Sequence, residues 1–250
     1  MKILITGASS GIGAALARRY ATSDNHLILL ARDRSRLQEL QDTLTPKGYS
    51  ACKVDIIDVD ICDFDLLQEK IKEIGFVDMA ILNAGISIGH SLEVTPFDDF
   101  KRLYDTNLLS YHAVLEPLLP KFKEQGSGTI VFISSLASII TMPSSVAYSS
   151  SKRALNAYAE GVRYKYKPYG IDVINILPGF IDTPLTQKNG FSMPFLMSLE
   201  EGSKRIVKAI ERKKRIYAFP LRFYLMIKTI ELLPHGVKER LIAYIVSKKV

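Results

Sequence analysis

Residues 2–20 read KILITGASSGIGAALARRY. Lys2–Thr6 is a run of apolar and β-branched residues, typical of a strand that is buried on both faces. The glycine-rich segment TGASSGIG follows at 6–13, and the residues after it have the apolar spacing of a helix. Such a turn lets the backbone approach a phosphate, and the helix N-terminus adds N–H donors and a partial positive charge. This junction predicts a dinucleotide site in an α/β fold.

Each glycine of this loop has its own geometric task. Gly7 allows a tight turn, Gly11 lets the backbone approach a pyrophosphate, and Gly13 lets helix and strand pack closely. A glycine-rich loop alone often marks only a turn, so its position between the first strand and the first helix is the informative part. The predicted cofactor-binding residues of this loop are Gly7, Ser9, Ser10, Gly11, Ile12 and Gly13.

The rest of the chain repeats the alternation of strand and helix. The predicted strands are Lys2–Thr6, His26–Ala31, Lys53–Val59, Asp78–Leu82, Thr129–Ser134, Asp172–Leu177 and Ile216–Phe219. The predicted helices are Gly11–Thr22, Asp33–Leu44, Phe64–Ile74, Phe97–Phe122, Tyr148–Tyr166 and Glu200–Lys213, followed by two short ones at Leu221–Leu233 and Val237–Val246. This order predicts an α/β fold: a Rossmann-type, doubly wound parallel sheet of about seven strands with helices on both faces. Ligands of such sheets bind beyond the carboxyl ends of the strands.

The composition is that of a globular protein. The 250 residues are 47% hydrophobic and 24% charged, which excludes a disordered chain, because such chains are poor in apolar residues. Neither an internal repeat nor a linker rich in Pro, Gly or Ser is present, so we expect a single domain over residues 1–250. Two cysteines exclude a disulfide framework, and no two of the four histidines have the spacing of metal ligands, so we expect no metal site.

The N-terminus indicates a cytoplasmic location. MKILITG lacks the charged segment and long apolar stretch of a signal peptide. A membrane span needs about 20 mainly apolar residues, and the longest uncharged apolar stretch late in the chain is Phe223–Ile227. We therefore expect a cytoplasmic protein.

Basic residues are concentrated near the C-terminus. Residues 204–250 contain 13 of the 33 Lys and Arg residues but only 3 of the 26 Asp and Glu residues, so this tail accounts for the net charge of +7. The asymmetry fits an anionic partner or membrane surface, and equally a solvated face of basic helices. Tyr224 and Tyr244 could stack on bases, but the helical spacing of the apolar residues fits packing better, so we expect no nucleic acid partner.

The end of the second strand discriminates between the two nicotinamide cofactors. NAD sites place an acid there, to bind the 2′-hydroxyl of the ribose. This chain has Ala31 at that position, followed by Arg32, and a guanidinium pairs well with a 2′-phosphate. Asp33 could serve as the acid after a shift of one residue. The sequence therefore predicts NADP(H), with NAD(H) as the weaker alternative.

Two further segments after strands fit a cofactor site. Asp60 and Ile61 follow the third strand where an adenine would lie, and Asn83-Ala84-Gly85 follows the fourth strand. Both segments could equally be ordinary turns at strand ends.

Tyr148 and Lys152 are the candidate proton-transfer pair. They lie four residues apart in a helical stretch, so both side chains share one face. A phenol with a pKa near 10 exchanges protons poorly at pH 7, and a neighbouring ammonium lowers that pKa. An isolated Tyr-x-x-x-Lys is weak evidence for catalysis, because it is common by chance. The evidence is strengthened by Ser135, at the end of the fifth strand, and by Asn107, in the helix before that strand.

The motifs taken together resemble the short-chain dehydrogenase/reductase family. They are TGASSGIG at 6–13, Asn83-Ala84-Gly85, Asn107, Ser135, Tyr148-x-x-x-Lys152, and Pro178-Gly179 with Thr183. The match in order and spacing covers about residues 1–215. Each motif is weak, but their conjunction is specific. The resemblance implies a seven-stranded sheet and hydride transfer between a nicotinamide and a carbonyl or alcohol carbon.

The resemblance also implies a role for each matching residue. Tyr148 would protonate the carbonyl oxygen, Lys152 would bind the nicotinamide ribose and lower the pKa of Tyr148, and Ser135 would hydrogen-bond the substrate oxygen. Asn107 would hold a water that links Lys152 to solvent. The residues that would contact the cofactor, besides the glycine loop, are Arg32, Asp60, Ile61, Asn83, Ala84, Gly85, Tyr148, Lys152, Pro178, Gly179, Ile181 and Thr183. The family also suggests a homodimer, with a tetramer as the alternative.

The chain departs from the family pattern at its C-terminal end. It continues about 30 residues past the last strand, and this helical extension, residues 220–250, resembles the tails of membrane-associated hydroxysteroid-type members. We expect it to cap the pocket or a dimer partner, to touch a membrane surface, or simply to pack on the core. Residues 183–200 are expected to form a lid over the substrate, since the segment is apolar and adaptable and Gly190 and Pro194 favour mobility. An apolar lid predicts a hydrophobic ketone or alcohol.

The predicted function is an NADPH-dependent carbonyl reductase or the reverse alcohol dehydrogenase. An isomerase or dehydratase on the same scaffold is the alternative among enzymes. Among proteins that are not enzymes, the alternative is a catalytically silent NADP(H) sensor or interaction protein. Such a protein is expected to carry other residues at the catalytic positions, and this sequence carries none.

Overall fold

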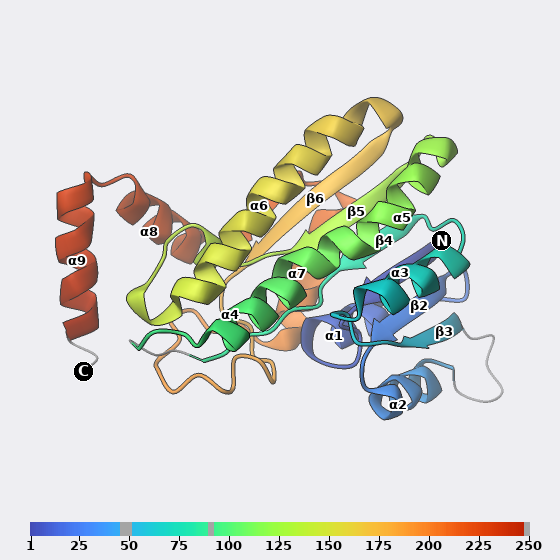
Figure 1. Cartoon of the computed structure of the whole chain (residues 1–250), viewed down its shortest axis with the longest axis horizontal. Helices are drawn as coiled ribbons and strands as arrows, with labels where there is room; N and C mark the ends of the chain where they lie inside the picture. The colour runs from blue at the N-terminus through green and yellow to red at the C-terminus, as the bar shows by residue number, and fades with distance from the viewer. Residues whose placement is uncertain (46–51, 90–92, 248–250) are drawn as a thin grey trace.

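A seven-stranded parallel sheet forms the centre of the molecule (Figure 1). The computed structural model describes residues 1–45, 52–89 and 93–247. The strands are β1 (Lys2–Thr6), β2 (His26–Ala31), β3 (Lys53–Asp58), β4 (Met79–Leu82), β5 (Gly128–Ile133), β6 (Ile171–Pro178) and β7 (Ile216–Phe219). Their order in the sheet is β3-β2-β1-β4-β5-β6-β7, so the chain reverses its direction of winding between β1 and β4. The predicted fold class is confirmed.

Helices cover both faces of this sheet. The helices are α1 (Gly11–Tyr20), α2 (Arg34–Leu44), α3 (Phe64–Glu73), α4 (Phe97–Tyr104), α5 (Ser110–Gln125), α6 (Val146–Tyr166), α7 (Leu199–Glu211), α8 (Leu221–Glu231) and α9 (His235–Ser247). One core contains buried residues of α1, α2 and α7, and the other contains buried residues of α3, α5 and α6. Alternation along the strands supplies both: Ile3 and Ile5 belong to the first core and Leu4 to the second.

The helix predicted over Phe97–Phe122 is interrupted. A π-helical turn at Asp105–Leu109 separates α4 from α5. Such a turn inserts about one residue into a helix, so it leaves the apolar pattern on either side intact and is invisible to periodicity. The other predicted helices and strands agree with the structure to within about two residues at each end.

The C-terminal helices stand at one end of the molecule, away from β1–β3 (Figure 1). Phe223 and Ile227 of α8 are buried in a third apolar cluster with Leu136, Ile140 and Leu177. Helix α9 has no buried residue. None of the helices within the described residues is long and apolar enough to cross a bilayer.

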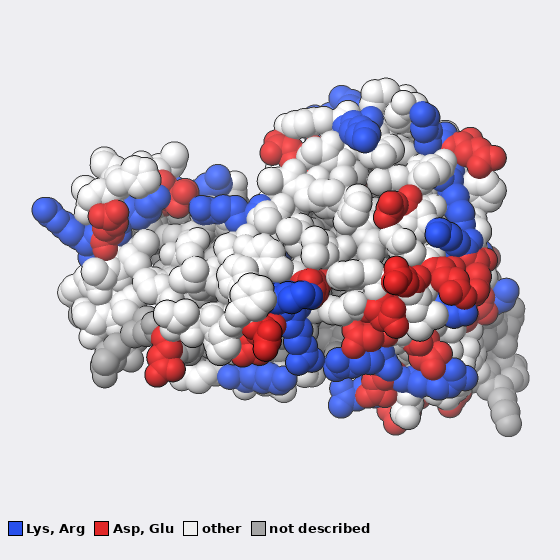
Figure 2. Space-filling view, viewed as in Figure 1, with Lys and Arg blue, Asp and Glu red and all other residues white. Residues whose placement is uncertain are grey.

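The two ends of the molecule also differ in charge. Figure 2 shows acidic and basic side chains crowded on the side of α2 and α3, whereas the end that carries α8 and α9 is mostly uncharged. Large apolar side chains are exposed on these two helices, among them Leu221, Leu225, Leu232, Val237 and Tyr244.

Candidate active site

A cleft of about 700 Å³ lies at the carboxyl ends of the strands, and its size is typical of small-molecule sites. It extends across the point where the sheet reverses its winding, which is where open α/β sheets bind ligands. All the predicted site residues line it except Gly13 and Asn107, which lie behind its wall. The structure thus brings together residues from positions 7 to 183.

Two glycines of the loop have no room for a side chain. Gly7 has a φ of +64°, and a Cβ there would lie 2.9 Å from the Cα of Ala84. A Cβ on Gly13 would lie 2.3 Å from the carbonyl oxygen of Gly7. Because backbone atoms cannot give way as a flexible side chain can, α1 packs this closely on the loop only with glycine at position 13.

Hydrogen bonds from β4 hold the loop at the end of β1. The backbone N–H groups of Asn83 and Ala84 donate to Thr6 Oγ1 at 2.9 and 3.1 Å. The side-chain amide of Asn83 donates to the carbonyl oxygens of Thr6 and Gly7 at 3.1 and 3.3 Å. Asn83 therefore fixes the shape of the loop as well as lining the cleft.

The N-terminus of α1 opens into the cleft. Ser10 is the N-cap residue, yet its side chain makes no capping hydrogen bond. The N–H groups of the first turn are thus not capped by a side chain, and the positive end of the helix dipole faces the cavity. Both features suit an anionic group such as a pyrophosphate.

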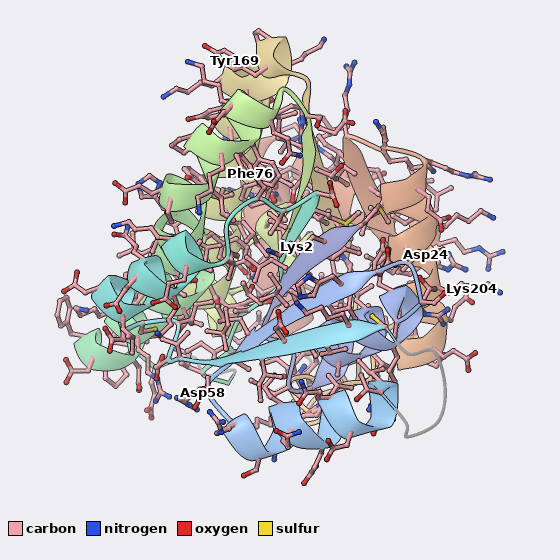
Figure 3. All side chains as sticks on the ribbon, turned by 90° about the vertical axis from the view of Figure 1, so that its right-hand side faces the viewer. Lys2, Asp24, Asp58, Phe76, Tyr169 and Lys204 are labelled. Carbon is pink, nitrogen blue, oxygen red and sulfur yellow. The ribbon has the colours of Figure 1, made fainter. Side chains whose placement is uncertain are left out.

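Arg32 lies at the far end of the cleft and is largely exposed. Its guanidinium is 3.4 Å from Asp60, a weak ion pair that a 2′-phosphate could replace. Asp33, the alternative ribose acid, is engaged elsewhere, since it caps α2 by accepting from the backbone N–H of Arg36 at 3.1 Å. Figure 3 labels Asp58 on the neighbouring β3, where it pairs with Arg34 at 2.9 Å.

Arg36 also lines the cleft, although the sequence analysis did not single it out. Its guanidinium lies 3.3 Å from Asp33. The available signal was its basic character in the first turn of the helix that follows Arg32.

Tyr148 and Ser135 meet at the opposite end of the cleft. Tyr148 enters from the first turn of α6 and Ser135 from the end of β5. Burial raises the pKa of the Tyr148 phenol, and a hydrogen bond with Ser135 offsets part of that rise. Ser135 Oγ also accepts from the backbone N–H of Ala137 at 3.1 Å, so the hydroxyl proton of Ser135 is the one it donates to an oxygen, either that of Tyr148 or that of a ligand.

Lys152 is a buried amine. Its Nζ donates to the carbonyl oxygen of Ile133 at 3.1 Å and lies 5.7 Å from the ring centre of Tyr111. Burial lowers the pKa of Lys152 to about 7. Burial disfavours the charged forms of both Lys152 and Tyr148. The effect of Lys152 on the pKa of Tyr148 stays a prediction.

Asn107 lies in the π-helical turn and is fully buried. Its side chain accepts from the N–H of Ile86 at 2.8 Å and donates to the carbonyl oxygen of Ile86 at 3.0 Å. A Cβ on Gly85 would lie 3.3 Å from Asn107 Oδ1 and 3.4 Å from Lys152 Nζ. The glycine thus keeps a space open between the amide and the amine.

A hydrogen-bond network behind Ser135 was not anticipated. Asn156 Nδ2 donates to Ser138 Oγ at 2.6 Å, and Ser138 Oγ donates to the carbonyl oxygen of Ser135 at 2.5 Å. Arg153 donates to the carbonyl oxygens of Ser138, at 2.9 Å, and Ile139. Arg153 and Asn156 follow Lys152 on α6, so one helix carries both the candidate acid and the supports of the serine segment.

The predicted lid leaves β6 through a tight turn. The hydroxyl of Thr186 donates to the carbonyl oxygen of Ile181 at 2.6 Å, and the backbone N–H of Thr183 donates to that hydroxyl at 3.0 Å. The returning chain pairs Met197 with Ile181 as a short parallel bridge. Ile181 and Met197 therefore hold the two ends of the predicted lid together, and we call this bridge the neck of the lid.

No three His, Cys, Asp or Glu side chains gather in a way that could hold a metal ion within residues 1–45, 52–89 and 93–247. The polar lining of the cleft includes donors suited to phosphate and hydroxyl oxygens, such as Ser10, Arg32 and Lys152.

The family model described as short chain dehydrogenase matches residues 1–192. The chain belongs to the short-chain dehydrogenase family. An uncharacterized oxidoreductase of Mycobacterium tuberculosis is 35% identical to it over 224 residues, which are 88% of each chain. Members of this family are oxidoreductases on a fold that binds nicotinamide cofactors, and the predicted membership is confirmed.

Solved structures of other short-chain dehydrogenases share the fold. A short-chain dehydrogenase from Sphingobium yanoikuyae in complex with NADPH superposes with a TM-score of 0.83 at 25% identity, covering 97% of this chain and 95% of that one. A bulky-bulky ketone specific alcohol dehydrogenase from Comamonas testosteroni has a TM-score of 0.79 at 23% identity, with 94% and 95% covered. The second likeness is evidence for the fold alone.

Proposed function

We propose that this short-chain dehydrogenase is an NADPH-dependent carbonyl reductase, able to run in reverse as an alcohol dehydrogenase. The observation that carries this proposal is the arrangement of one cleft. Ser135, Tyr148 and Lys152 lie at one end of it, and the glycine loop and Arg32 lie toward the other.

The residues of the cleft fit a dinucleotide. The backbone of the glycine loop and the N-terminus of α1 would hold the pyrophosphate, and Asp60 and Ile61 would contact the adenine. Arg32, with Arg36 beside it, would bind the 2′-phosphate, which favours NADP(H) over NAD(H). The nicotinamide half would lie along Asn83, Ala84 and Gly85 on one side and along Pro178, Gly179, Ile181 and Thr183 on the other.

The bound nicotinamide supplies hydride chemistry, and the protein's own residues handle the substrate oxygen. Ser135 donates a hydrogen bond to that oxygen, where negative charge develops, and Tyr148 donates the proton that completes the alcohol. In the reverse direction Tyr148 accepts the alcohol proton.

Lys152 has two functions in this scheme. Its amine binds the ribose hydroxyls, and its charge stabilises the phenolate that Tyr148 becomes after proton donation. With a pKa of about 7 the amine gains and loses a proton readily near neutral pH. The space over Gly85 fits a water between Lys152 and Asn107, which would return a proton to the pair.

An apolar carbonyl substrate is favoured by the wall next to Ser135. Beside Ser135 the cleft is lined by the apolar residues Ile133, Pro178 and Ile181, and Pro184 and Leu185 continue that lining into the predicted lid. Residues 183–200 would act as the substrate lid, on a single domain spanning 1–250. The ketone named for the Comamonas testosteroni neighbour is consistent with such a wall, as a fold-level analogy.

Association with other surfaces is a separate part of the proposal. We expect a homodimer, with a tetramer as the alternative. The exposed apolar side chains of α8 and α9, beside Arg222, Lys228, Lys238 and Arg240, favour a peripheral contact with an anionic membrane surface for an otherwise cytoplasmic protein. Lys248 and Lys249 of the 220–250 extension lie outside the described residues.

Binding and turnover together test the proposal. NADPH and NADH are titrated by fluorescence, and NADPH oxidation is then followed with aromatic, steroid, long-chain and small ketones. Tight NADPH binding with turnover is the expected result. Tyr148→Phe should keep the NADPH affinity and lose about 10³-fold in turnover, since it removes the acid alone. NADPH binding with equal, residual turnover in both proteins would favour the silent sensor, and absence of nucleotide binding would refute both.

A further inference from the structure

Four phenylalanines from three separate segments form one aromatic cluster beside the cleft. Phe180 follows β6, Phe191 and Phe195 lie in the predicted lid, and Phe223 lies in the first turns of α8. The ring of Phe223 stacks on Phe180 at a centroid distance of 5.7 Å and meets Phe195 at 5.7 Å. Phe180 meets Phe191 edge to face at 5.8 Å. These distances are those of favourable aromatic pairs.

Phe223 is the centre of this cluster and its most buried member. Its side chain is 8% exposed, whereas Phe195 is 46% exposed. The Cδ1 of Phe223 lies 3.1 Å from the position that a Cβ on Gly179 would take, so the ring lies directly behind the cleft-lining Gly179. A residue of the C-terminal extension thus contacts both the lid and the wall of the candidate nicotinamide site.

The backbone of Phe195 is in an unusual conformation. Its φ is +58°, a left-handed value that costs a bulky residue on the order of 1–3 kcal/mol. Asparagine or glycine would adopt it more easily. The conformation directs the ring of Phe195 to Phe223, so the strain and the aromatic contact occur together.

The exposed tip of the lid rests on α8. The neck is fixed at Ile181 and Met197, and Phe191 attaches the lid to Phe180, but Pro194, Phe195 and Leu196 are exposed. The ring contact found for Phe195 in the described part of the chain is that with Phe223. The position of this tip is therefore coupled to α8.

We propose that Phe223 is a specificity-determining residue: it is the seat on which the lid closes, and it selects carbonyl substrates that carry a bulky apolar group next to the reacting carbon. This inference rests on the proposed function. A bulky apolar group would be covered by the apolar side chains of the lid, such as Leu185 at the edge of the cleft, and Phe223 would hold the lid in place from the third apolar cluster. A small ketone would reach Ser135 and Tyr148 without needing that cover.

Cleavage by trypsin measures the position of the lid without any substrate. Lys188 is exposed in the lid, so the rate of cleavage after Lys188 reports how far the lid departs from its seat. Phe223→Ala should raise this rate at least fivefold, and Phe223→Leu, which keeps the site apolar if the alanine variant folds poorly, should raise it at least twofold. The matched control is Leu225→Ala on the same helix, where the side chain is 53% exposed. Its rate should stay within twofold of the parent protein.

Kinetics on a pair of ketones tests the selection itself. Phe223→Ala should raise the KM for a bulky aromatic ketone about tenfold and the KM for a small ketone less than twofold, both measured at saturating NADPH. Phe223→Tyr, which restores the ring, should restore the KM. Equal changes for both ketones would overturn the specificity role, and unchanged cleavage after Lys188 in both Phe223→Ala and Phe223→Leu would overturn the seat.

The two proposals fail in different ways. If the parent protein reduces no ketone, the proposed function fails and the specificity role falls with it, while the cleavage rates still decide whether Phe223 seats the lid. Two substitutions of Phe195 then distinguish the effect of losing the aromatic contact from the effect of the strained backbone. Phe195→Gly relieves the left-handed strain and Phe195→Ala keeps it, so the seat predicts a loosened lid in both, and a loosened lid in Phe195→Ala alone would contradict it.

Discussion

The two ends of the cleft are built in different ways. The cofactor end is made of strand ends and one helix N-terminus, and backbone atoms fix it: Gly13 packs on Gly7, and the N–H groups of Asn83 and Ala84 bond Thr6. The substrate end is made of a loop with a closed neck and a C-terminal helix, and side chains such as Phe195 and Phe223 hold it. Backbone contacts tolerate almost no change, whereas side-chain contacts can be exchanged. The cofactor end should therefore be the fragile part and the substrate end the adaptable one.

Gly13→Ala should have the largest effect and tests the fragility of the cofactor end. The new methyl group would lie 2.3 Å from a carbonyl oxygen, so we expect a loss of about 3 kcal/mol or more in the free energy of unfolding, measured by denaturant titration. The control is Gly161→Ala on α6, where a Cβ meets nothing within 4 Å. It should stabilise the protein by about 0.5–1 kcal/mol. Equal changes in the free energy of unfolding for Gly13→Ala and Gly161→Ala would contradict the fragility of the cofactor end.

Lys152→Met should stabilise the cofactor-free protein at low pH. The folded pKa of Lys152 is about 7, below the value of about 10.4 in an unfolded chain, so charging the buried amine opposes folding. This cost is complete below pH 7 and disappears as the pH rises toward 10. We expect the variant to be more stable by on the order of 3 kcal/mol at pH 6.

Denaturant titration from pH 6 to pH 10 measures that difference. The exposed Lys204 of α7, labelled in Figure 3, supplies the control Lys204→Met. Its stability relative to the parent protein should not vary with pH over this range. A Lys152→Met advantage that is the same at pH 6 and pH 10 would show that burial of the charge is not its cause.

Arg32→Ala should change cofactor preference more than stability. A charge-assisted contact is worth about 1.5–3 kcal/mol, so the affinity for NADPH should fall roughly 10- to 100-fold while that for NADH stays constant. Arg34 is the matched control, because the side chains of Arg32 and Arg34 are 69% and 68% exposed and each pairs with one aspartate. If Arg34→Ala lowers the NADPH affinity as much as Arg32→Ala does, Arg32 acts only through the local positive charge and makes no specific contact with the 2′-phosphate.

Removal of α9 should have the smallest effect on stability. The helix has no buried residue, and only Ile242 packs on the third apolar cluster as a partly buried side chain. A chain ending at Pro234 should lose less than about 1 kcal/mol of stability. Its sedimentation with vesicles of anionic phospholipid should fall severalfold if α9 contributes to membrane contact. A large loss of stability would mean that the C-terminal end is as tightly built as the cofactor end.

The same division separates what the sequence could and could not predict. The strands, the glycine loop and the positions after the strands follow local patterns, and the structure gathers them at one edge of the sheet. The π-helical turn at Asp105–Leu109 was missed because the residues on both sides of it are helical and its extra residue shifts the apolar pattern without ending it. The depth to which Tyr148 and Lys152 are buried could not be predicted either, because it depends on residues far away in the chain. The cluster of Phe180, Phe195 and Phe223 has no local signature at all.

The neck of the lid has a consequence for protein engineering. Because Ile181 and Met197 are already held together, the residues between them form a loop whose ends stay in place, and each doubling of such a loop's length costs only about 0.6 kcal/mol. The segment between Ile181 and Met197 can thus be exchanged as a unit. Loops of other lengths and chemistries can be grafted between the two residues while the glycine loop and the strand ends are left as they are, and under the proposed function such grafts would change the choice of substrate.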